Sequence, residues 1–443
     1  MSRLTPNRRL LIVSPHFPPL NAPDHQRVRM SLPHYAACGW EPVVLCIARD
    51  RQSGVIEEEL AQTLPAGVRI IEIKAFSPRW TRLIGVGNAG LRCWLPMLFA
   101  GLRLLRREKF DLVFFSTTQF FTFTLGRIWR RLRGVPYVFD MQDPWRTDYY
   151  QRPGSRPPPG GWKYRFARLV AWTLEGWSFR RVSGVMSVSP DYIADLRARY
   201  PRLAGVPAET IRFGASAEDL GAARRWPAPN PGFTRAAGEV HLVYTGASGP
   251  VTPHALTVLF DAVRRFREAH PERAARLRFH FLGTSYVAPG EGRPSVLPLA
   301  EKLGVADLVR EIPHRLGHLE CLRLQEQADV LLLPGSNDPA YSPSKTYPYF
   351  LTGRPILGLV FAGSVLEALL MELGGAHVVR FTENEAKDEA HAAIGRFLDA
   401  AIDGRVAGLV APRREEHFTR EFLAPGLTAR QAGLFHAACA HRD

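Results

Sequence analysis

The stretch that decides the fold is residues 328–357, which read ADVLLLPGSNDPAYSPSKTYPYFLTGRPIL. An apolar run opens it and predicts a buried strand, and a polar turn follows. The apolar segment from Lys345 to Thr352 then predicts a helix that ends at Gly353. Pro355 begins another apolar run, which predicts the next strand. This order of strand, loop, helix and strand is typical of one unit of a parallel α/β sheet.

The loop before this helix carries an unusual residue for this chain. Only six of the 57 lysine and arginine residues are lysines, and one of them, Lys345, follows Ser342 and Ser344 at the start of the helix. A helix N-terminus offers N–H groups and partial positive charge, so serine hydroxyls and an ammonium beside it suit a diphosphate. An ordinarily capped helix with a solvated lysine is the alternative, and this segment alone leaves both open.

Similar alternation extends outward over the whole chain. In the first half, strands are expected at 9–14, 41–48, 68–74, 111–116, 134–140 and 183–189, and helices at 28–39, 91–107, 120–132 and 190–200. In the second half, strands are expected at 240–245, 277–283, 309–312, 330–334 and 355–359, and helices at 255–270, 297–303, 319–328 and 345–352. Apolar strands separated by helices indicate parallel sheets covered on both faces. The sequence therefore predicts two tandem doubly wound α/β domains, each with its ligand crevice at the carboxyl ends of its strands.

The proline-rich stretch 226–238 separates the two halves and predicts a linker. We accordingly place the N-terminal domain at 1–225 and the C-terminal domain at 239–415. A length of 443 residues with 46% hydrophobic side chains is enough for two such cores.

The cysteines and the chain ends bear on the compartment. Five scattered cysteines form no zinc-binding spacing, which fits reduced thiols in the cytoplasm. The short basic start has no secretion-signal pattern, and no apolar run approaches the length of a membrane span. We therefore expect a cytoplasmic globular protein.

Positive charge is concentrated in the first half of the chain. Residues 1–225 contain 34 basic and 18 acidic side chains, whereas residues 226–443 contain 23 and 24. The asymmetry predicts an anionic partner of the first half, such as a membrane surface, a phosphorylated lipid or nucleic acid. Nucleic acid is disfavoured because no reader motif accompanies the charge. The stretches 91–107 and 162–181 contain tryptophan and basic residues, as segments that bind an anionic membrane surface do. The alternative is that they are core helices whose arginines face solvent.

Short motifs spread over both halves occur together in one family. They are LLIVSPHFPP at 10–19 with Gln26 and Arg27, VFDMQDPW at 138–145, VMSVS at 185–189, IRFGA at 211–215, VYTG at 243–246, FLGT at 281–284 and the block 328–355. In this order and spacing the chain resembles the GT-B glycosyltransferases, specifically their retaining family 4, also called glycosyltransferase group 1.

The resemblance implies two Rossmann-like domains with an interdomain cleft. It further implies transfer of a sugar from a nucleotide-diphosphate-sugar to an acceptor, with retention of configuration and no metal or other cofactor. The acceptor is expected in the basic first domain and could be a lipid-linked saccharide of surface polysaccharide. The protein would then work peripherally at the inner face of the membrane. The last segment, 416–443, is expected to cross back to the first domain, as in the family.

Donor-site candidates follow from the need to neutralise the leaving diphosphate by fixed donors and cations. They are Lys345, Ser344, Ser342, Gly246, Gly283, Thr284, Asp338 and Arg27. Glycines at strand tips allow a phosphate to approach the backbone, although ordinary turn glycines are the alternative. No Asp-x-Asp motif stands in a suitable loop, and His314 and His318 are expected in a loop beside Pro313, so no metal site is predicted.

Two first-domain residues are candidates for catalysis. Asp143 lies just after a predicted strand, where it could bind an acceptor hydroxyl or steady the reacting sugar; a helix cap or a salt bridge with Arg146 is the alternative. His16 lies in the first loop and could contact the acceptor or a donor phosphate, or be structural. For Arg27 the choice is between a bidentate phosphate contact and a solvated helix charge.

One departure from the family pattern concerns the donor ribose. Members usually carry two glutamates eight positions apart before the Gly-x-Pro that ends this block, and here those positions hold Ala340 and Pro348. Neither side chain accepts a hydrogen bond, and Asp338 is the nearest carboxylate. We favour a divergent enzyme. A non-catalytic GT-B-like binding or scaffold protein that has lost donor recognition is the alternative.

Overall fold

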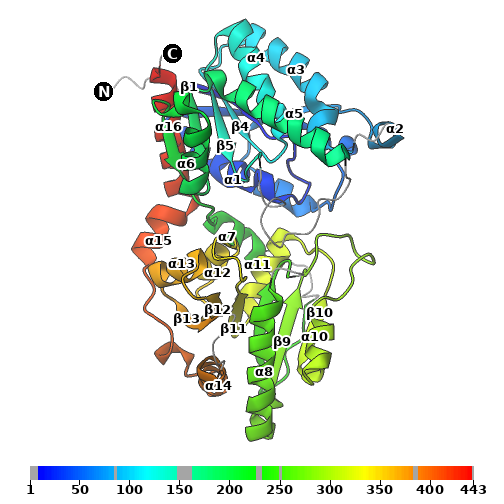
Figure 1. Cartoon of the computed structure of the whole chain (residues 1–443), viewed down its shortest axis with the longest axis vertical. Helices are drawn as coiled ribbons and strands as arrows, with labels where there is room; N and C mark the ends of the chain where they lie inside the picture. Colours follow the sequence, from blue (N-terminus) through cyan, green and yellow to red (C-terminus); the bar gives the residue numbers. More distant parts are fainter. Residues whose placement is uncertain are drawn as a thin grey trace. The chain divides into compact units, whose positions relative to one another are not determined.

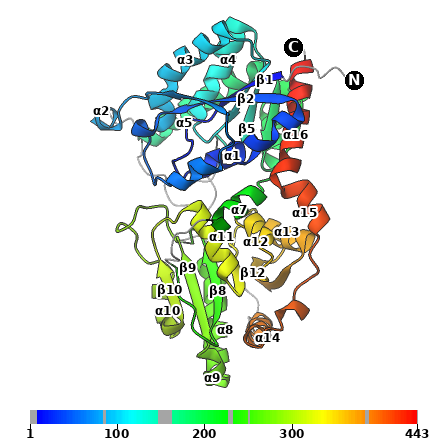
Figure 2. The ribbon, with the colours of Figure 1, turned by 180° about the vertical axis from the view of Figure 1, so that it is seen from behind.

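The computed structural model describes residues 8–83, 87–146, 162–225, 232–248, 252–382 and 388–441. The chain divides into two compact units, the first made of residues 1–213 with 424–443 and the second of residues 214–423 (Figures 1 and 2). The division therefore falls before the predicted boundary at 225. Of the predicted linker 226–238, residues 226–231 lie outside the described part of the chain.

A seven-stranded parallel sheet forms the centre of the first unit, in the order β3-β2-β1-β4-β5-β6-β7. Its strands are β1 (Arg8–Val13), β2 (Trp40–Ile47), β3 (Arg69–Ile73), β4 (Leu112–Ser116), β5 (Tyr137–Met141), β6 (Gly184–Ser187) and β7 (Ala208–Thr210). Its helices are α1 (Gln26–Ser31), α2 (Pro78–Leu83), α3 (Ala89–Arg107), α4 (Phe123–Arg133), α5 (Trp162–Ser178), α6 (Pro190–Arg199) and α16 (Ala424–Ala440).

The two faces of this sheet are both buried, because successive side chains of a strand point to opposite faces. Leu11 and Val13 of β1 join a cluster with residues of α3 and α4. Leu10 and Ile12 join a different cluster, which contains residues of α1 and α16. This two-sided burial explains why the strands read as continuous apolar runs rather than as alternating ones.

The last helix, α16, completes the first unit although it lies far along the chain. The Tyr35 hydroxyl donates to Gln431 Oε1 at 2.7 Å, and Gln431 Nε2 donates to Ser31 Oγ at 2.9 Å. Phe435 packs against Phe114 with ring centroids 4.9 Å apart. The preceding helix α15 (Glu415–Phe422) belongs to the second unit. The segment that joins the first unit thus begins at 424 rather than at the predicted 416.

The second unit has a six-stranded parallel sheet in the order β10-β9-β8-β11-β12-β13. Its strands are β8 (Val240–Thr245), β9 (Leu277–Leu282), β10 (Val309–Ile312), β11 (Val330–Pro334), β12 (Ile356–Phe361) and β13 (Ala376–Phe381). Its other helices are α7 (Ala217–Arg225), α8 (Pro253–Ala269), α9 (Pro271–Ala274), α10 (Leu297–Lys302), α11 (His318–Gln327), α12 (Thr346–Leu351), α13 (Val365–Leu373) and α14 (Asp388–Ile402). The predicted plan of two Rossmann-like sheets is confirmed.

Two predicted helices are shorter in the structure. The helix expected at 28–39 is α1, which ends at Ser31 and continues as short 3₁₀ turns up to the left-handed Gly39. Pro33 explains the break, because it cannot donate the hydrogen bond that an α-helix needs at that position. The helix expected at 345–352 is α12, which has only six residues.

Gly101 tests the packing of the first unit. A Cβ at this position of α3 would lie 2.1 Å from Cζ2 of Trp129, which is fully buried in the core. We expect Gly101→Ala to lower the free energy of unfolding by about 1–3 kcal/mol because the indole would have to move. Gly433→Ala is the matched control, since that helical glycine has open space around it and should tolerate the substitution. Urea denaturation of both variants measures the difference, and equal stabilities would contradict this packing.

Candidate functional site

The strand order of the second unit reverses direction between β8 and β11, which are paired neighbours. From β8 the chain proceeds to β9 and β10 on one side, and from β11 to β12 and β13 on the other. Ligands of open α/β sheets bind at the carboxyl ends of the strands beside such a switch point. Here the edge carries Gly246 directly after β8 and the loop from Gly335 to Lys345 after β11.

Lys345 reaches back from this loop to β8. Its Nζ donates to the Tyr244 hydroxyl at 2.6 Å and lies 4.3 Å from the centre of the same ring. Gly246 has a φ of +127°, and a Cβ there would lie 2.6 Å from Nζ, so glycine leaves the room that the ammonium occupies. Burial lowers the pKa of Lys345 from its ordinary value to about 7.

Tyr244 contacts this lysine, and Tyr341 and Tyr349 lie close enough to Tyr244 to raise its pKa; the sequence did not single out any of the three. Burial raises the pKa of Tyr244 well above its ordinary value and that of Tyr341 to about 12. The Tyr349 hydroxyl accepts a hydrogen bond from the backbone N–H of Thr245 at 2.8 Å. These phenols stay neutral and add no negative charge beside the ammonium. Tyr341 and Tyr349 stand four residues before and four residues after Lys345 in the sequence, which was the available signal for two of them.

The other predicted donor residues of this loop are arranged around its turn. Ser342 and Ser344 are exposed beside Lys345. The Asp338 carboxylate accepts a hydrogen bond from the backbone N–H of Ala340 at 3.0 Å, so it stabilises its own turn. Pro348 lies within α12, whose six residues give only a weak helix dipole. Lys345 is the one basic residue of the loop 335–345.

Gly283 and Thr284 follow β9 and lie beside the Gly246 loop. The backbone N–H of Gly246 donates to the Leu282 carbonyl at 2.8 Å, and that of Ser248 to the Thr284 carbonyl at 3.2 Å. The Thr284 hydroxyl itself is engaged, since it donates to Glu311 Oε1 at 2.5 Å. Both residues thus reach the same edge of the sheet, with the Thr284 side chain directed to Glu311.

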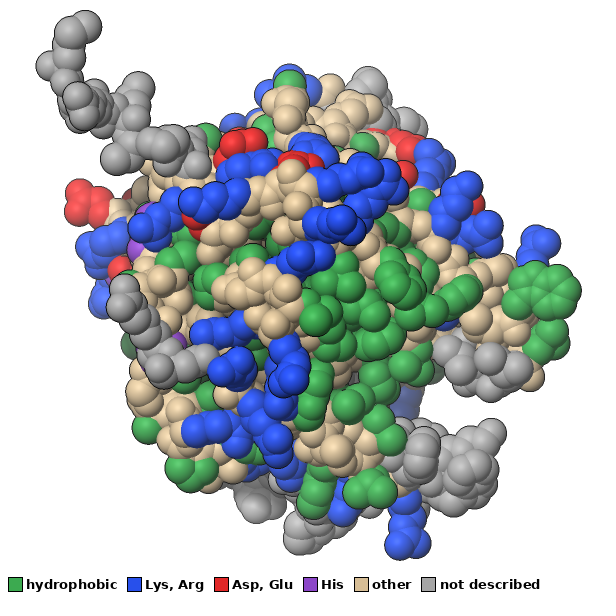
Figure 3. Space-filling model, turned by 90° about the horizontal axis from the view of Figure 1, so that it is seen from above, with side chains coloured by type: hydrophobic (Ala, Val, Ile, Leu, Met, Phe, Trp, Pro, Cys, Tyr) green, Lys and Arg blue, Asp and Glu red, His purple; other side chains and the backbone are tan. Residues whose placement is uncertain are grey.

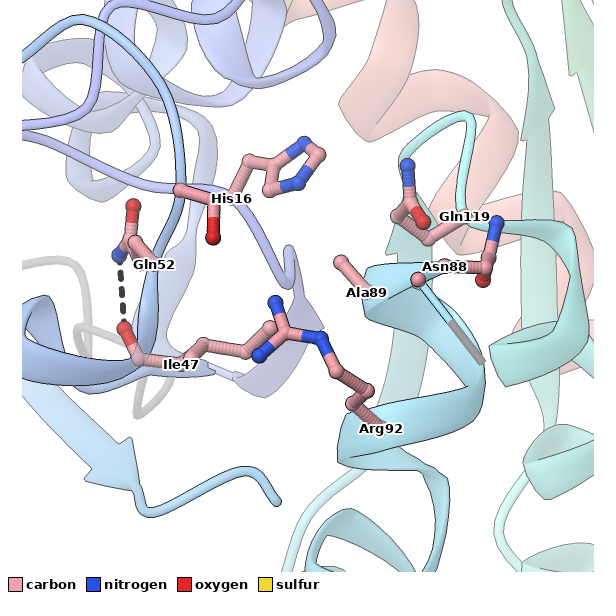
Figure 4. Close-up of a pocket in the computed structure, with 9 residues that line it drawn as sticks. His16, Ile47, Gln52, Asn88, Ala89, Arg92 and Gln119 are labelled. Atoms are coloured by element: carbon pink, nitrogen blue, oxygen red, sulfur yellow. Dashed lines mark hydrogen bonds between the residues drawn. The ribbon is translucent and has the colours of Figure 1, made fainter. Parts of the chain in front are cut away.

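The first unit has its own switch point, between β1 and β4. A cavity of about 240 Å³ opens there. Its lining includes His16 after β1, Gln52 after β2, Gln119 after β4, Asn88 just before α3, and Arg92 of α3. Figure 4 shows His16, Gln119 and Arg92 around one hollow. The position is the one that the sheet topology predicts for a ligand.

His16 is held in this cavity by a carboxylate that the sequence did not single out. Its Nδ1 lies 3.0 Å from Asp24 Oδ1, and Asp24 Oδ2 accepts a hydrogen bond from the Thr117 hydroxyl at 2.9 Å. Burial works to raise the pKa of Asp24, but the hydrogen bond and charge of His16 outweigh it and lower the pKa to about 2. Asp24 therefore orients the imidazole ring. Its signal was a carboxylate eight residues after His16 in the loop that leaves β1.

Asp143 and Arg27 occupy different surroundings. Asp143 follows β5 and is exposed, yet partial burial of its carboxyl group and the charge of Asp24 raise its pKa. Arg27 is buried, with its Nε 2.9 Å from Asp140 Oδ2, and it donates to the Ile211 carbonyl at 2.7 Å. The expected phosphate contact of Arg27 does not fit this placement. We assign Arg27 to the packing of the first unit.

Among the residues that the structure describes, no group of three or more His, Cys, Asp or Glu side chains is arranged to hold a metal ion. Within the same ranges, no helix combines the length and the apolar character that crossing a membrane requires.

Two Rossmann-like sheets in tandem, each with its candidate site at a switch point, define the GT-B fold. Residues 25–214 match the family model described as the glycosyl transferase 4-like domain. This match identifies a glycosyl transferase 4-like domain in the first unit, and the plan of two sheets is that of the GT-B fold. No curated protein sequence matches the chain.

Solved structures support the fold at low sequence identity. Sucrose-phosphate synthase from Thermosynechococcus elongatus is 14% identical with a TM-score of 0.59, over 97% of this chain and 98% of that chain. WaaG, a glycosyltransferase involved in lipopolysaccharide biosynthesis, is 13% identical with a TM-score of 0.56, over 96% and 99%. A glycosyltransferase from Rickettsia africae is 11% identical with a TM-score of 0.52, over 98% and 100%.

The lowered pKa of Lys345 gives a stability signature. A lysine that binds its proton less tightly when folded destabilises the protein fully below about pH 7, and the penalty fades as the pH rises towards the ordinary lysine value. Lys345→Met removes the penalty, so we expect the variant to melt roughly 4 °C or more above the wild type at about pH 6. The gap should narrow towards about pH 10. Thermal denaturation in phosphate-free buffer measures it, and a gap independent of pH would contradict the burial of this ammonium.

Proposed function

We propose that the protein transfers a sugar from a nucleoside-diphosphate sugar to a hydroxyl of an acceptor. The observation that carries the proposal is Lys345, whose ammonium lies between Tyr244 and Gly246 at the switch point of the second unit. A diphosphate leaving group gains negative charge as its bond to the sugar breaks. A fixed cation in a partly desolvated site stabilises that charge better than water does.

Binding of the donor would change the protonation of Lys345. With its pKa near 7, the free side chain carries its proton only part of the time at neutral pH. A bound diphosphate would favour the protonated form, so the charge would be strongest when the donor is present. Ser342 and Ser344, exposed on the same loop, would donate hydrogen bonds to phosphate oxygens, and Gly246 leaves the space in which the ammonium lies beside them. We expect a metal-independent reaction that retains the anomeric configuration.

The acceptor would bind in the cavity of the first unit. Asp24 holds His16 through Nδ1, so the ring can contact an acceptor hydroxyl through its other nitrogen. Asp143, with its raised pKa, is the second candidate for contact with the reacting groups. Ala340 and Pro348 leave the donor ribose without the two glutamates that the family pattern has. We propose that Asp338 and the tyrosines near Lys345 recognise this part of the donor instead.

A saccharide acceptor linked to a lipid suits the outer surface of the first unit. Several large apolar side chains of α2 and α3 are exposed there, namely Trp80 (74%), Leu83 (78%), Leu91, Leu95 and Phe99 (62%). Figure 3 shows hydrophobic side chains gathered beside Lys and Arg side chains on this face. Arg103, Arg106 and Arg107 of α3 are exposed as well. Such a surface favours peripheral binding of a cytoplasmic protein to an anionic membrane.

The donor site is tested by ligand-induced stabilisation. UDP, GDP, dTDP and CMP and their sugars are added separately to the full chain, and the melting temperature is measured. We expect one nucleoside diphosphate to stabilise the wild type by about 2.7 kcal/mol at a hundredfold excess over its Kd. The same ligand should bind Lys345→Met at least about tenfold more weakly, because the variant lacks the cation.

The same experiment separates the two hypotheses for this chain. Stabilisation that survives unchanged in Lys345→Met would refute the proposed phosphate site. No stabilisation of the wild type, and no nucleoside diphosphate released from any nucleotide sugar, would favour the non-catalytic binding protein.

Membrane binding is tested by sedimentation with vesicles that contain about one third anionic lipid. We expect the wild type to pellet with these vesicles, and Phe99→Glu to pellet less, because a carboxylate would enter the apolar face of α3. Met371→Glu is the matched control, since Met371 is an exposed apolar residue (54%) of the second unit. Equal sedimentation of all three proteins would contradict this surface assignment.

A further inference from the structure

The side chains that line the cavity of the first unit indicate which kind of acceptor group it can bind. The lining residues that the structure describes include Arg92 and His16 and the uncharged polar side chains of Gln52, Asn88 and Gln119. No Asp or Glu occurs among these described lining residues. At about 240 Å³ the cavity is smaller than the roughly 300–1,000 Å³ of sites for drug-sized ligands. It suits one small polar group, and an anionic group would have to lie near Arg92 because Asp24 already pairs with His16.

Arg92 is the cation of this cavity, and the backbone holds it in place. Arg92 is only 2% exposed. Its Nη1 donates hydrogen bonds to the carbonyls of Arg51 at 3.2 Å and Phe76 at 3.0 Å. Figure 4 shows the guanidinium directed into the hollow from α3. The two carbonyls hold the guanidinium in position, so it needs little reordering when an anion arrives.

The start of α3 lies on the same wall and adds to the positive potential. Asn88 is the N-cap of this 19-residue helix and accepts a hydrogen bond from the backbone N–H of Leu91 at 3.1 Å. Gln119 Oε1 accepts a hydrogen bond from the backbone N–H of Gly90 at 3.0 Å. This bond connects the loop after β4 to the start of α3. The N-terminal end of a helix carries partial positive charge, so it and Arg92 favour an anion together.

We propose that this cavity binds a phosphate group of the acceptor, so that the acceptor is a phosphorylated saccharide rather than a neutral one. The inference rests on the proposed glycosyl transfer and deepens it. Arg92 would pair with the phosphate oxygens, Asn88 and Gln119 would donate through their amide groups, and His16 would contact a hydroxyl of the attached sugar. A phosphate of this kind can belong to a free sugar phosphate or to a lipid-linked one.

Direct binding to the full chain tests this site. Lys345→Met serves as the background, because it removes the phosphate contact proposed in the second unit. Glucose 1-phosphate and a soluble short-chain phosphatidic acid are the two probes, and calorimetric titration measures their affinities. They distinguish a free sugar phosphate from a lipid phosphate.

Two variants place a carboxylate in the cavity while they keep the fold. Asn88→Asp preserves the N-cap and suits a helix start, so it should not destabilise the protein. Gln119→Glu preserves the acceptor for the Gly90 N–H. We expect each to weaken binding of the recognised probe about tenfold, as a like charge a few ångströms from the phosphate should. Gln62→Glu, on an exposed residue of the same unit, is the matched control and should leave the affinity unchanged.

The outcomes separate this site from the donor site. Loss of affinity in both cavity variants with either probe supports the proposal, and the preferred probe identifies the source of the phosphate. Affinity unchanged by Asn88→Asp and Gln119→Glu, or no binding of either probe, overturns it. Nucleoside diphosphate binding to the wild type is measured separately, so failure of the donor site would be visible on its own.

Discussion

An ammonium group held beside a glycine and against a phenol is the constraint on which the second unit's site depends. Moving a charged group out of water is costly, so Lys345 loses affinity for its proton unless an anion compensates the charge. The arrangement exists only because Gly246 has no Cβ and Tyr244 presents its hydroxyl at 2.6 Å. The free protein thus carries an unfavourable charge that a diphosphate would relieve.

The first unit follows the same physical plan with different residues. Its switch point also holds a fixed cation, Arg92, close to where β1 and β4 end. The guanidinium keeps its charge at any accessible pH, whereas the lysine of the second unit does not. A permanent cation suits a substrate that is always charged. A cation with a lowered pKa suits a group whose charge grows during the reaction.

Strand positions could be predicted because both faces of each sheet are buried, which leaves continuous apolar runs. Elements at the edge of the second sheet, β13 with α13 and α14, were not identified. Arg27 shows why site assignment is harder, because its partner Asp140 lies on another strand and no local pattern reveals the pair. Asp24 is similar, since its contact with Thr117 exists only once β1 and β4 are neighbours. Lys345 could be found from the sequence because lysine is rare in this chain and because this lysine follows closely after a predicted strand.

The lysine content allows the central claim to be measured directly. With only six lysines in the chain, ¹³C-labelled lysine gives a spectrum in which Lys345 can be assigned by comparison with Lys345→Met. Its side-chain resonance should titrate near pH 7 in the free protein, and at a clearly higher pH once the stabilising nucleoside diphosphate is bound. If all six lysines titrate at the ordinary value, with and without nucleotide, the account of Lys345 as the diphosphate cation is contradicted.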